Sequence, residues 1–519
     1  MMTMKKKSFR YIKETLIPLL LFSSVAGIFT GIIIFLFKIA STAIIGWSGE
    51  IYGAVRANPI FIPLLILGAG AVGSIAALIL RVAPDCRGGG IPSAIAALRG
   101  VVPIHRAYSL PLIFFTSTLT YLCGVPLGTE GPSVQMGTLV GWITSKLLGK
   151  KNRAWHRYVM TGGACAGFAA ATGAPLTGIF FAFEEAHRRF TPMIFMTASL
   201  TTLFSSITME LLCLVSGISP KLFGFSIDAI MPVEYMWSAL VIGIVCGIVA
   251  ILFTKTYKRV HDALEKHARR IPFILRIVII FVLTAVVGLI SSPLIGTGHH
   301  LIDELIEGHG VWYMLIIFLL VRAIFLMVAN TQGVTGGLFI PSLAIGAMIG
   351  ALCAKAMVAI GFLPAEYGVI CIVVGMVSFL SASSRVPITA LAFALEALSG
   401  HTNFLPIAIG VAVAFAVIEV VGIHSFNDTV VDMKIEDYNK GRELIESDVE
   451  LVVQKGAFVI GKEIKDVLWP PNCVVIPVIK ASKGPAIGEG DLLRVHCRTH
   501  HPEFIEARLE ELLGNQYGD

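Results

Sequence analysis

Long apolar stretches separated by short polar segments make up most of this chain. The clearest stretches run from about residue 16 to 37, 60 to 80, 238 to 253, 274 to 290, 312 to 328 and 405 to 421. A bilayer core needs about 20 apolar residues per straight helix, so these stretches predict membrane-spanning helices. Two others, 164–183 and 339–360, are broken by Gly or Pro. Short or interrupted segments in corresponding halves of a chain indicate a transporter's binding site.

Two segments 209 residues apart share a pattern that begins a helix inside the membrane. Gly128–Gly137 and Gly336–Gly346 both lead into Pro-Ser-x-x-x-Gly-x-x-x-Gly, which starts at Pro132 and at Pro341. Proline at a first helical position, after glycine, predicts a helix start, where the first N–H groups lack helical partners. An anion satisfies these donors well, because they lie at the positive end of the helix dipole. Since the first start also carries Glu130, the pattern predicts an anion pathway with an ionisable residue in it.

A second pair of segments repeats at nearly the same spacing. Ala174–Glu184 aligns with Val386–Glu396 at an offset of 212 residues. The membrane region therefore contains two structural halves of similar length. Whether they run parallel or inverted stays open here, although inverted halves would bring the two helix starts together near the membrane midplane. The alternative is a duplication whose halves share no site.

Composition agrees with a membrane protein, because 55% of the residues are hydrophobic, 14% are charged and the mean hydropathy is +0.81. Basic residues cluster beside apolar spans, as at 146–157 and 255–270. This placement favours the positive-inside arrangement over a nucleic-acid partner, and the basic cluster within 5–13 predicts a cytoplasmic N-terminus. The nine cysteines form no C-x-x-C pair, and neither a disulfide nor a metal site is predicted.

Several of these segments resemble the CLC family of chloride channels and transporters. Gly88–Pro92, Gly128–Pro132 and Gly337–Pro341 are similar to the three anion-pathway motifs of that family, and Pro175–Glu185 also fits. The resemblance covers about residues 10 to 435, and three spaced motifs with a repeat are far more specific than one short pattern. It implies an all-α polytopic membrane protein with two inverted repeats and many broken or half helices. It also implies a homodimer, with one anion pathway per subunit, in a bacterial inner membrane.

Carried over position by position, Glu130 matches the glutamate that gates the family's pathway from outside. A carboxylate in an anion site competes with chloride, whereas protonation removes its charge and frees the site. Anions would bind among the matched positions, which are Gly89, Gly90, Ile91, Gly128, Gly131, Gly337, Leu338, Phe339, Ile340 and, at a late helix start, Asn427. The alternative for Glu130 is an acid that only stabilises a helix N-terminus.

Glu184 and Glu185 end an apolar helix just before two arginines. In the family's transporters the second acid of this pair relays protons from the cytoplasm, whereas channels commonly lack it. Glu185 therefore favours exchange of chloride, or a similar small anion, for protons. One alternative is an ion pair of Glu185 with Arg188 or Arg189 at helical spacing. Glu396, the repeat partner of Glu184, is expected to be structural. For the whole chain, the alternatives are a passive anion channel and a membrane protein that regulates without transporting.

Two positions depart from the family's pattern. Gly89 replaces the usual serine of the first motif, so a hydroxyl donor to the anion is lost and backbone N–H groups remain. The usual tyrosine of a late helix start has no obvious equivalent; alignment puts Asn427 there, and Asn427 and Asp428 are also ordinary helix-cap residues. Both changes put selectivity for chloride over nitrate, and tight coupling to protons, in doubt. The family's fluoride-exporting branch usually has methionine at the first position, so fluoride ranks lower.

The pattern after about residue 438 is that of a small α/β domain. The β-like runs are 449–453, 473–479 and 492–496, and 504–513 has one apolar helical face. We therefore divide the chain into a membrane domain, 1–435, and a cytoplasmic domain, 436–519. Nine Lys/Arg and thirteen Asp/Glu between 441 and 519 give a net charge of −4, which leaves +10 for the rest.

This C-terminal segment resembles the RCK C-terminal (TrkA-C-like) domain that regulates bacterial potassium transport. The resemblance rests on Gly-Lys-x-Ile at 461–464, a central Val/Ile strand, and Gly-Asp-x-Leu-x-Val at 490–495. It implies a dimeric regulator with cyclic di-AMP as its candidate ligand, and a dimerisation module without a ligand is the alternative. No other cofactor is predicted. The sequence has no P-loop and no Ser/His/Asp arrangement, so it predicts a transporter and not an enzyme.

Overall fold

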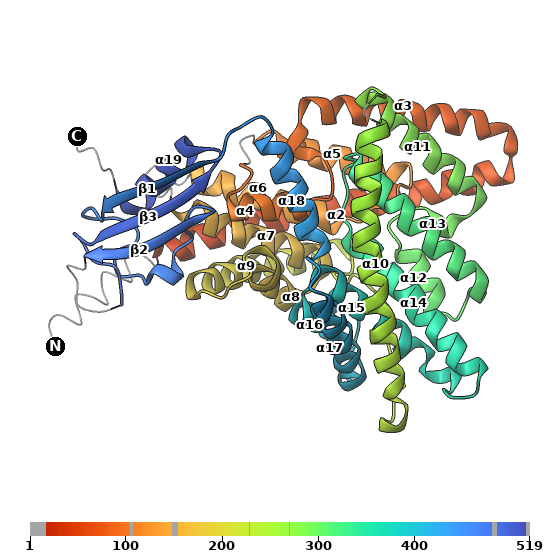
Figure 1. The fold of residues 1–519 in the computed structure, drawn as a ribbon. Helices are drawn as coiled ribbons and strands as arrows, with labels where there is room; N and C mark the ends of the chain where they lie inside the picture. The colour runs from red at the N-terminus through yellow and green to blue at the C-terminus, as the bar shows by residue number, and fades with distance from the viewer. Residues whose placement is uncertain are drawn as a thin grey trace.

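The computed structural model describes residues 17–103, 107–147, 154–227, 229–268, 270–479 and 485–514. Helices form the larger part of the molecule, and a small sheet with one helix lies at one side of them (Figure 1). Nine helices within these described ranges are long and apolar enough to cross a membrane. The predicted N-terminal basic cluster lies outside the described residues.

Two series of eight helices follow one another in the same order, and α18 (Phe426–Asn439) then leads to the sheet. The first series is α2 (Ile17–Ala57), α3 (Ile62–Val82), α4 (Ile91–Arg99), α5 (Ser109–Leu122), α6 (Glu130–Leu147), α7 (His156–Thr172), α8 (Pro175–Phe181) and α9 (Pro192–Ser216). The second is α10 (Trp237–Ala268), α11 (Phe273–Ile290), α12 (His299–Ile306), α13 (Trp312–Thr331), α14 (Phe339–Ala359), α15 (Gly368–Ser384), α16 (Pro387–Ala397) and α17 (Phe404–Val421). The clearest predicted spans correspond to α2, α3, α10, α11, α13 and α17, so these predictions are confirmed.

Matching chain reversals interrupt both series. Between α7 and α8 the backbone turns at Gly173, which is left-handed with φ 67°, and Pro175 begins the next helix. Between α15 and α16 the same left-handed turn is made by Arg385, with φ 58°, and Pro387 begins the next helix. A left-handed residue ends a helix, and proline fits a first helical position whose N–H has no partner. The predicted break within 164–183 is therefore confirmed, whereas the predicted break within 339–360 is wrong, because that segment forms the single helix α14.

The two helix starts of the repeat lie slightly earlier than predicted. α6 begins at Glu130 and α14 at Phe339, so Pro132 and Pro341 are third in their helices rather than first. Proline is tolerated there for the same physical reason, because none of the first four N–H groups of a helix has a helical partner. The correction places the side chain of Glu130 itself at the start of α6.

The two halves are inverted and meet at equivalent residues. Gly128 and Gly337 form an isolated antiparallel bridge, in which each N–H donates to the other's carbonyl, at N···O distances of 2.7 and 2.6 Å. The side chain of Glu184 accepts the N–H groups of residues 388 and 389, and that of Glu396 accepts those of 176 and 177. Because each group pairs with its own equivalent, a local two-fold axis relates the halves. The predicted inverted repeat is confirmed.

Glycines allow the central helices of each half to pack with their backbones in contact. A Cβ on Gly137 of α6 would lie 2.2 Å from the carbonyl oxygen of Gly163 in α7. The equivalent Cβ on Gly346 of α14 would lie 2.4 Å from the carbonyl oxygen of Gly375 in α15. Small residues at helix interfaces permit this approach within a membrane, where apolar burial alone does not hold helices together.

The C-terminal segment folds into the predicted small α/β unit. Its sheet is antiparallel in the order β1-β3-β2, with β1 (Ile445–Val452), β2 (Cys473–Ile479) and β3 (Leu492–Thr499), and α19 (Pro502–Leu513) follows. The alternating buried positions of β3 pack in one apolar core with the buried face of α19. α18 runs to Asn439, past the predicted boundary at 435, and β1 begins at Ile445. We call residues 440–514 the tail.

Candidate functional site

The starts of three helices meet at the inverted repeat. An ideal Cβ on Gly90 would lie 2.1 Å from the carbonyl carbon of Gly131, and Gly90 has φ 69°. A Cβ on Gly131 would lie 2.4 Å from the oxygen of Gly89 and 2.5 Å from the Cα of Gly337. Only glycine permits this packing. The predicted motifs, which are far apart in the sequence, therefore bring the N-termini of α4, α6 and α14 together.

A small cavity of about 20 Å³ lies beside these helix starts. Six predicted site residues line it, namely Gly89, Ile91, Glu185, Leu338, Phe339 and Asn427. The other lining residues are Phe168, Ser342, Leu380, Ser384, Val386, Thr389 and Phe426. A cavity holds one water molecule when the space open to a water-sized sphere is about 10–15 Å³. The cavity therefore accommodates one small ion.

Glu130 is fully buried where α6 and α14 begin. Its Oε1 accepts a hydrogen bond from the Thr129 hydroxyl at 2.8 Å, and the backbone N–H of Ile340 faces the carboxylate. Its Oε2 has no hydrogen-bond partner among the described residues. The carboxylate thus lies at two converging helix N-termini, where an anion would also bind.

Two larger cavities flank this region. A far-side vestibule of about 590 Å³ is lined by residues that include Lys38, Tyr121, Thr129, Ser133 and His299. A tail-side vestibule of about 560 Å³ is lined by residues that include Gly88, Gly89, Tyr257, Asn330, Lys434 and Tyr438. Thr129 precedes Glu130, and Gly89 also lines the small cavity. Glu130 and the small cavity therefore lie between the two vestibules.

Glu185 lies in a π-helical turn, Ala182–Ala186, that continues from α8. The amide Nδ2 of Asn427 donates to its Oε1, and Arg99 donates to its backbone oxygen at 2.8 Å. π-turns within helices are rare and often occur at functional sites. The Glu185 carboxylate is thereby held in the wall of the small cavity.

The neighbouring arginines bond elsewhere. Arg188 forms an ion pair with Asp428, and Arg189 donates to the carbonyl of Val467 at 3.1 Å. Among the residues that the structure describes, neither arginine forms an ion pair with Glu185. The reason is that the chain leaves helical geometry at Arg188, which has φ 50°, so helical spacing does not apply.

The start of α18 is capped by Ser425, whose hydroxyl accepts the N–H of Asp428 at 3.0 Å. The alternative in which Asn427 acts as the cap is therefore wrong, because its side chain turns to Glu185. No tyrosine lies at this helix start, yet Tyr257 of α10 packs against Phe426 with ring centroids 4.6 Å apart. The sequence reasoning missed Tyr257, because it lies on a different helix.

Asn330, near the end of α13, is a second residue that the sequence reasoning missed. Its Oδ1 accepts a hydrogen bond from the hydroxyl of Tyr257 at 2.8 Å. A Cβ on Gly89 would lie 3.0 Å from its Nδ2. A buried amide within a mostly apolar span is a usable signal, as is Arg322 in the same helix, because polar side chains inside membrane helices are costly and usually functional.

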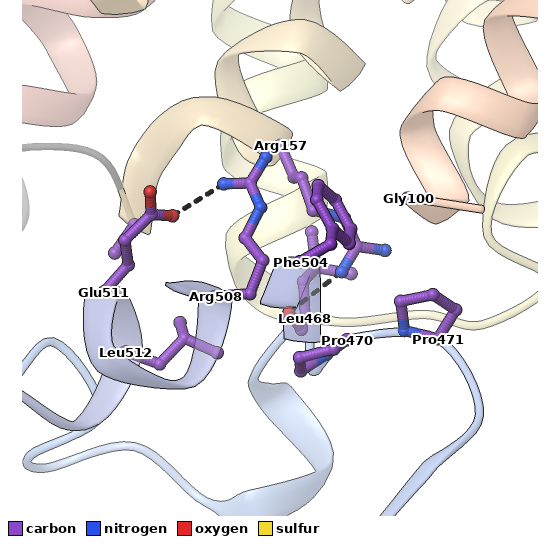
Figure 2. A pocket seen from close by; sticks show the side chains of 10 residues that line it. Gly100, Arg157, Leu468, Pro470, Pro471, Phe504, Arg508, Glu511 and Leu512 are labelled. Carbon is purple, nitrogen blue, oxygen red and sulfur yellow. Dashed lines mark hydrogen bonds and ion pairs between the residues drawn. The ribbon is translucent and has the colours of Figure 1, made fainter. Parts of the chain in front are cut away.

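The tail docks on the first half of the membrane domain through Arg157 of α7 (Figure 2). This buried guanidinium donates to the carbonyls of Leu98 and Arg99, at the end of α4, at 2.9 and 3.0 Å. It also donates to the carbonyls of Leu468 and Trp469 in the tail, at 3.0 and 2.7 Å. Cations stabilise the carbonyl end of a helix. Arg157, read from the sequence as part of a basic membrane flank, instead connects the tail to the helix that carries the first motif.

Comparisons with known proteins agree with this architecture. The family model described as voltage gated chloride channel matches residues 71–419, more than half of the chain. The fold is similar to that of a slow cyanobacterial Cl⁻/H⁺ antiporter, with a TM-score of 0.74 and 23% identity over 81% of this chain and 99% of that one. It is also similar to a eukaryotic CLC transporter, with a TM-score of 0.67 and 19% identity over 81% and 74% of the chains. A CLC-type fluoride/proton antiporter gives a TM-score of 0.65 and 19% identity over 79% and 97%.

Proposed function

Because this chain belongs to the voltage gated chloride channel family, we propose that it exchanges chloride, or a similar small monovalent anion, for protons across a membrane. The observation that carries the proposal is a pair of buried carboxylates in the region between the two vestibules. Glu130 lies at the converging helix starts, and Glu185 lies in the wall of the small cavity. Two of the similar structures are of antiporters that move protons, which supports coupling over passive conduction.

The two carboxylates have separate tasks. Ionised Glu130 occupies the positive end of α6 and α14 and excludes an anion, whereas protonated Glu130 has no charge to hold it there. An anion then takes its place, and the proton moves with the side chain. Glu185 receives and releases protons on the tail side. Asn427 keeps its carboxylate at the cavity wall.

Proton movement driven by an anion gradient tests this function. Purified protein in liposomes that carry a chloride gradient should move protons uphill. Glu130→Gln should abolish proton movement while anion flux persists and loses its pH dependence. Glu185→Gln should also abolish proton movement while some anion flux remains. Glu184→Gln is the matched control, because this neighbouring acid caps α16 and should leave coupling intact.

Each alternative function has its own outcome in the same assay. Chloride flux without proton movement in the unmodified protein would establish a passive channel. Absence of both fluxes, from protein that is folded and correctly inserted, would favour a regulator that does not transport. Proton exchange that survives in Glu130→Gln would show that the gate has been assigned to the wrong residue.

We also propose that the chain forms a homodimer in a bacterial inner membrane, with both termini in the cytoplasm, and that the tail regulates transport. What supports a paired tail is the row of exposed apolar residues on β2, namely Val474, Ile476, Val478 and Ile479. The net charge of −4 over residues 441–519 and the contact of the tail with α4 through Arg157 fit a regulator. Cyclic di-AMP is the candidate ligand, and its site would lie on the dimer axis.

Binding to the tail can alter transport only through different affinities for two transporter states, typically by about 5- to 150-fold. Light scattering on the full chain in detergent tests the dimer. Flux with and without cyclic di-AMP, together with calorimetry, tests the ligand. No binding at tens of micromolar and unchanged flux would reduce the tail to a dimerisation module that binds no ligand.

A further inference from the structure

We propose that Asn330, held in place by Tyr257, donates its amide group to the transported anion at the tail-side mouth of the small cavity. The inference rests on the proposed function, since it assigns a ligand to the same pathway. Nothing in the sequence motifs points to either residue, because α10 and α13 carry no helix start at the site.

The hydrogen bonding of Asn330 leaves one donor group unused. Its side chain is buried, and its Oδ1 is occupied by the hydroxyl of Tyr257 at 2.8 Å. Its Nδ2 has no hydrogen-bond partner among the described residues. A buried donor without a partner is costly, so such a group indicates a ligand or a bound water.

The unused donor points to the predicted pathway. An ideal Cβ on Gly89 would lie 3.0 Å from Nδ2 of Asn330. Gly89, Asn330 and Tyr257 all line the tail-side vestibule, and Gly89 lines the small cavity as well. The amide therefore lies where the vestibule meets the small cavity, next to the N-terminus of α4.

The pair also occupies the place of two missing groups. The family that this chain resembles usually has a serine hydroxyl at the position of Gly89 and a tyrosine hydroxyl at the start of α18, and this chain has neither. Asn330 reaches toward the first position, and Tyr257 packs on Phe426 at the second. The tyrosine hydroxyl is used to orient the amide, so Tyr257 is a positioning residue and Asn330 is the anion ligand.

The charges that line the vestibule do not favour one sign of ion. Its lining includes the cations Arg87, Arg276 and Lys434 and the acids Asp85, Glu265 and Asp437. Because both signs are present, net charge in the vestibule does not select an anion. An amide N–H group donates but does not accept, and the first N–H groups of α4 lie beside it. Together they favour an anion over a cation at the mouth.

Chloride binding to the purified full chain, measured by isothermal titration calorimetry, tests the proposal. Asn330→Ala should weaken binding by about tenfold to a hundredfold, the range for a hydrogen bond to a charged group. Tyr257→Phe should weaken it less, because the amide remains but is no longer held. Thr284→Val is the control. Its hydroxyl donates to the carbonyl of Ile280 within α11, and Thr284 lines neither vestibule nor the small cavity, so chloride binding should not change.

A paired substitution distinguishes an anion ligand from a structural amide. Gly89 does not have a left-handed φ, so its backbone accepts a side chain, but the Cβ would crowd Asn330. Gly89→Ser combined with Asn330→Ala removes the crowding and supplies a hydroxyl at the same place. This double variant should recover most of the chloride affinity that Asn330→Ala loses, while Gly89→Ala with Asn330→Ala should not.

Equal chloride affinity in the unmodified protein and Asn330→Ala would overturn the proposal and leave anion exchange standing. The proposal would also be overturned if Gly89→Ser combined with Asn330→Ala recovered thermal stability but not chloride affinity. If Asn330→Ala does not fold, Tyr257→Phe decides, and unchanged chloride affinity in that variant would reject the role. Absence of chloride binding and flux in the unmodified protein would instead reject the proposed function.

Discussion

The two halves of the membrane domain share a backbone but differ in chemistry. At an offset of 209, Glu130 of the first half corresponds to Phe339 of the second, and each is the first residue of its helix. The carboxylate of Glu130 has an oxygen without a hydrogen-bond partner in the described part of the chain. Phe339 instead packs edge-on between Phe168 and Phe393, at centroid distances of 5.0 and 5.1 Å. One start thus carries a titratable group, and the other an apolar wall.

The same contrast recurs at the second pair of landmarks. Glu184 and Glu396 correspond at an offset of 212. Glu184 of the first half accepts N–H groups at the start of α16, and Glu396 of the second half accepts those at the start of α8. The next position is Glu185 in the first half and Ala397 in the second. Inverted halves would otherwise present the same surface to both sides of the membrane. The packing of the two halves is therefore symmetric, whereas both candidate proton-carrying groups, Glu130 and Glu185, belong to the first half.

The largest expected effect concerns glycines whose role is the same in both halves. Gly137→Ala and Gly346→Ala should each destabilise the protein by about 1–3 kcal/mol or more, because the new methyl group meets a backbone oxygen that cannot move away. Thermal unfolding followed by size-exclusion chromatography checks this. A clear loss in one variant and none in the other would break the structural equivalence of the halves.

The next effect concerns the two helix starts, which should respond differently. Glu130→Ala should reduce the ratio of protons to chloride to zero, because it removes the group that carries the proton. Phe339→Leu should keep uphill proton movement, since it changes only the shape of the apolar wall. Parallel chloride and pH recordings in liposomes check both variants. Loss of coupling in Phe339→Leu would mean that the halves share the proton task.

A smaller loss of stability, equal in the two halves, is expected when either of the capping glutamates, Glu184 or Glu396, is removed. Glu184→Ala and Glu396→Ala each remove a carboxylate that accepts two backbone N–H groups and one threonine hydroxyl. Each should cost about 0.5–2 kcal/mol of stability, as for other N-terminal caps. Chemical or thermal unfolding measures this, and proton coupling should persist in both. If the two variants lost different amounts of stability, or if only Glu184→Ala lost proton coupling, Glu184 would have a role besides capping α16.

The smallest effect concerns the tail, which contacts the first half through Arg157, Tyr158 and Arg189. The hydroxyl of Tyr158 donates to the carbonyl of Asp466 at 3.1 Å and accepts the N–H of Leu468 at 3.0 Å. Tyr158→Phe should weaken docking by about 1 kcal/mol. Limited proteolysis of the tail should become faster, while coupling in liposomes stays intact. Unchanged proteolysis would show that the remaining contacts hold the tail.

Much of the architecture could be predicted from the sequence because its causes are local. Apolar length sets a spanning helix, and Gly and Pro set the breaks at 173–175 and at 128–132. The two offsets revealed the repeat, and alternation with turn residues located the strands of the tail. Glu130, Glu185 and the motif glycines were chosen from the same short patterns. Their helix boundaries were less accurate, since a proline fits several positions of a first turn.

Which distant groups come into contact could be seen only in the folded chain. It showed that the halves are inverted, that Asn427 holds Glu185, and that Asn330 lies against Gly89. It also placed the Sγ atoms of Cys473 and Cys497 2.8 Å apart across two strands, although no spacing in the sequence predicts a cysteine pair. Such contacts join residues far apart in the chain, so they depend on how whole helices and strands pack. Short patterns determine where an element begins; packing determines what its side chains face.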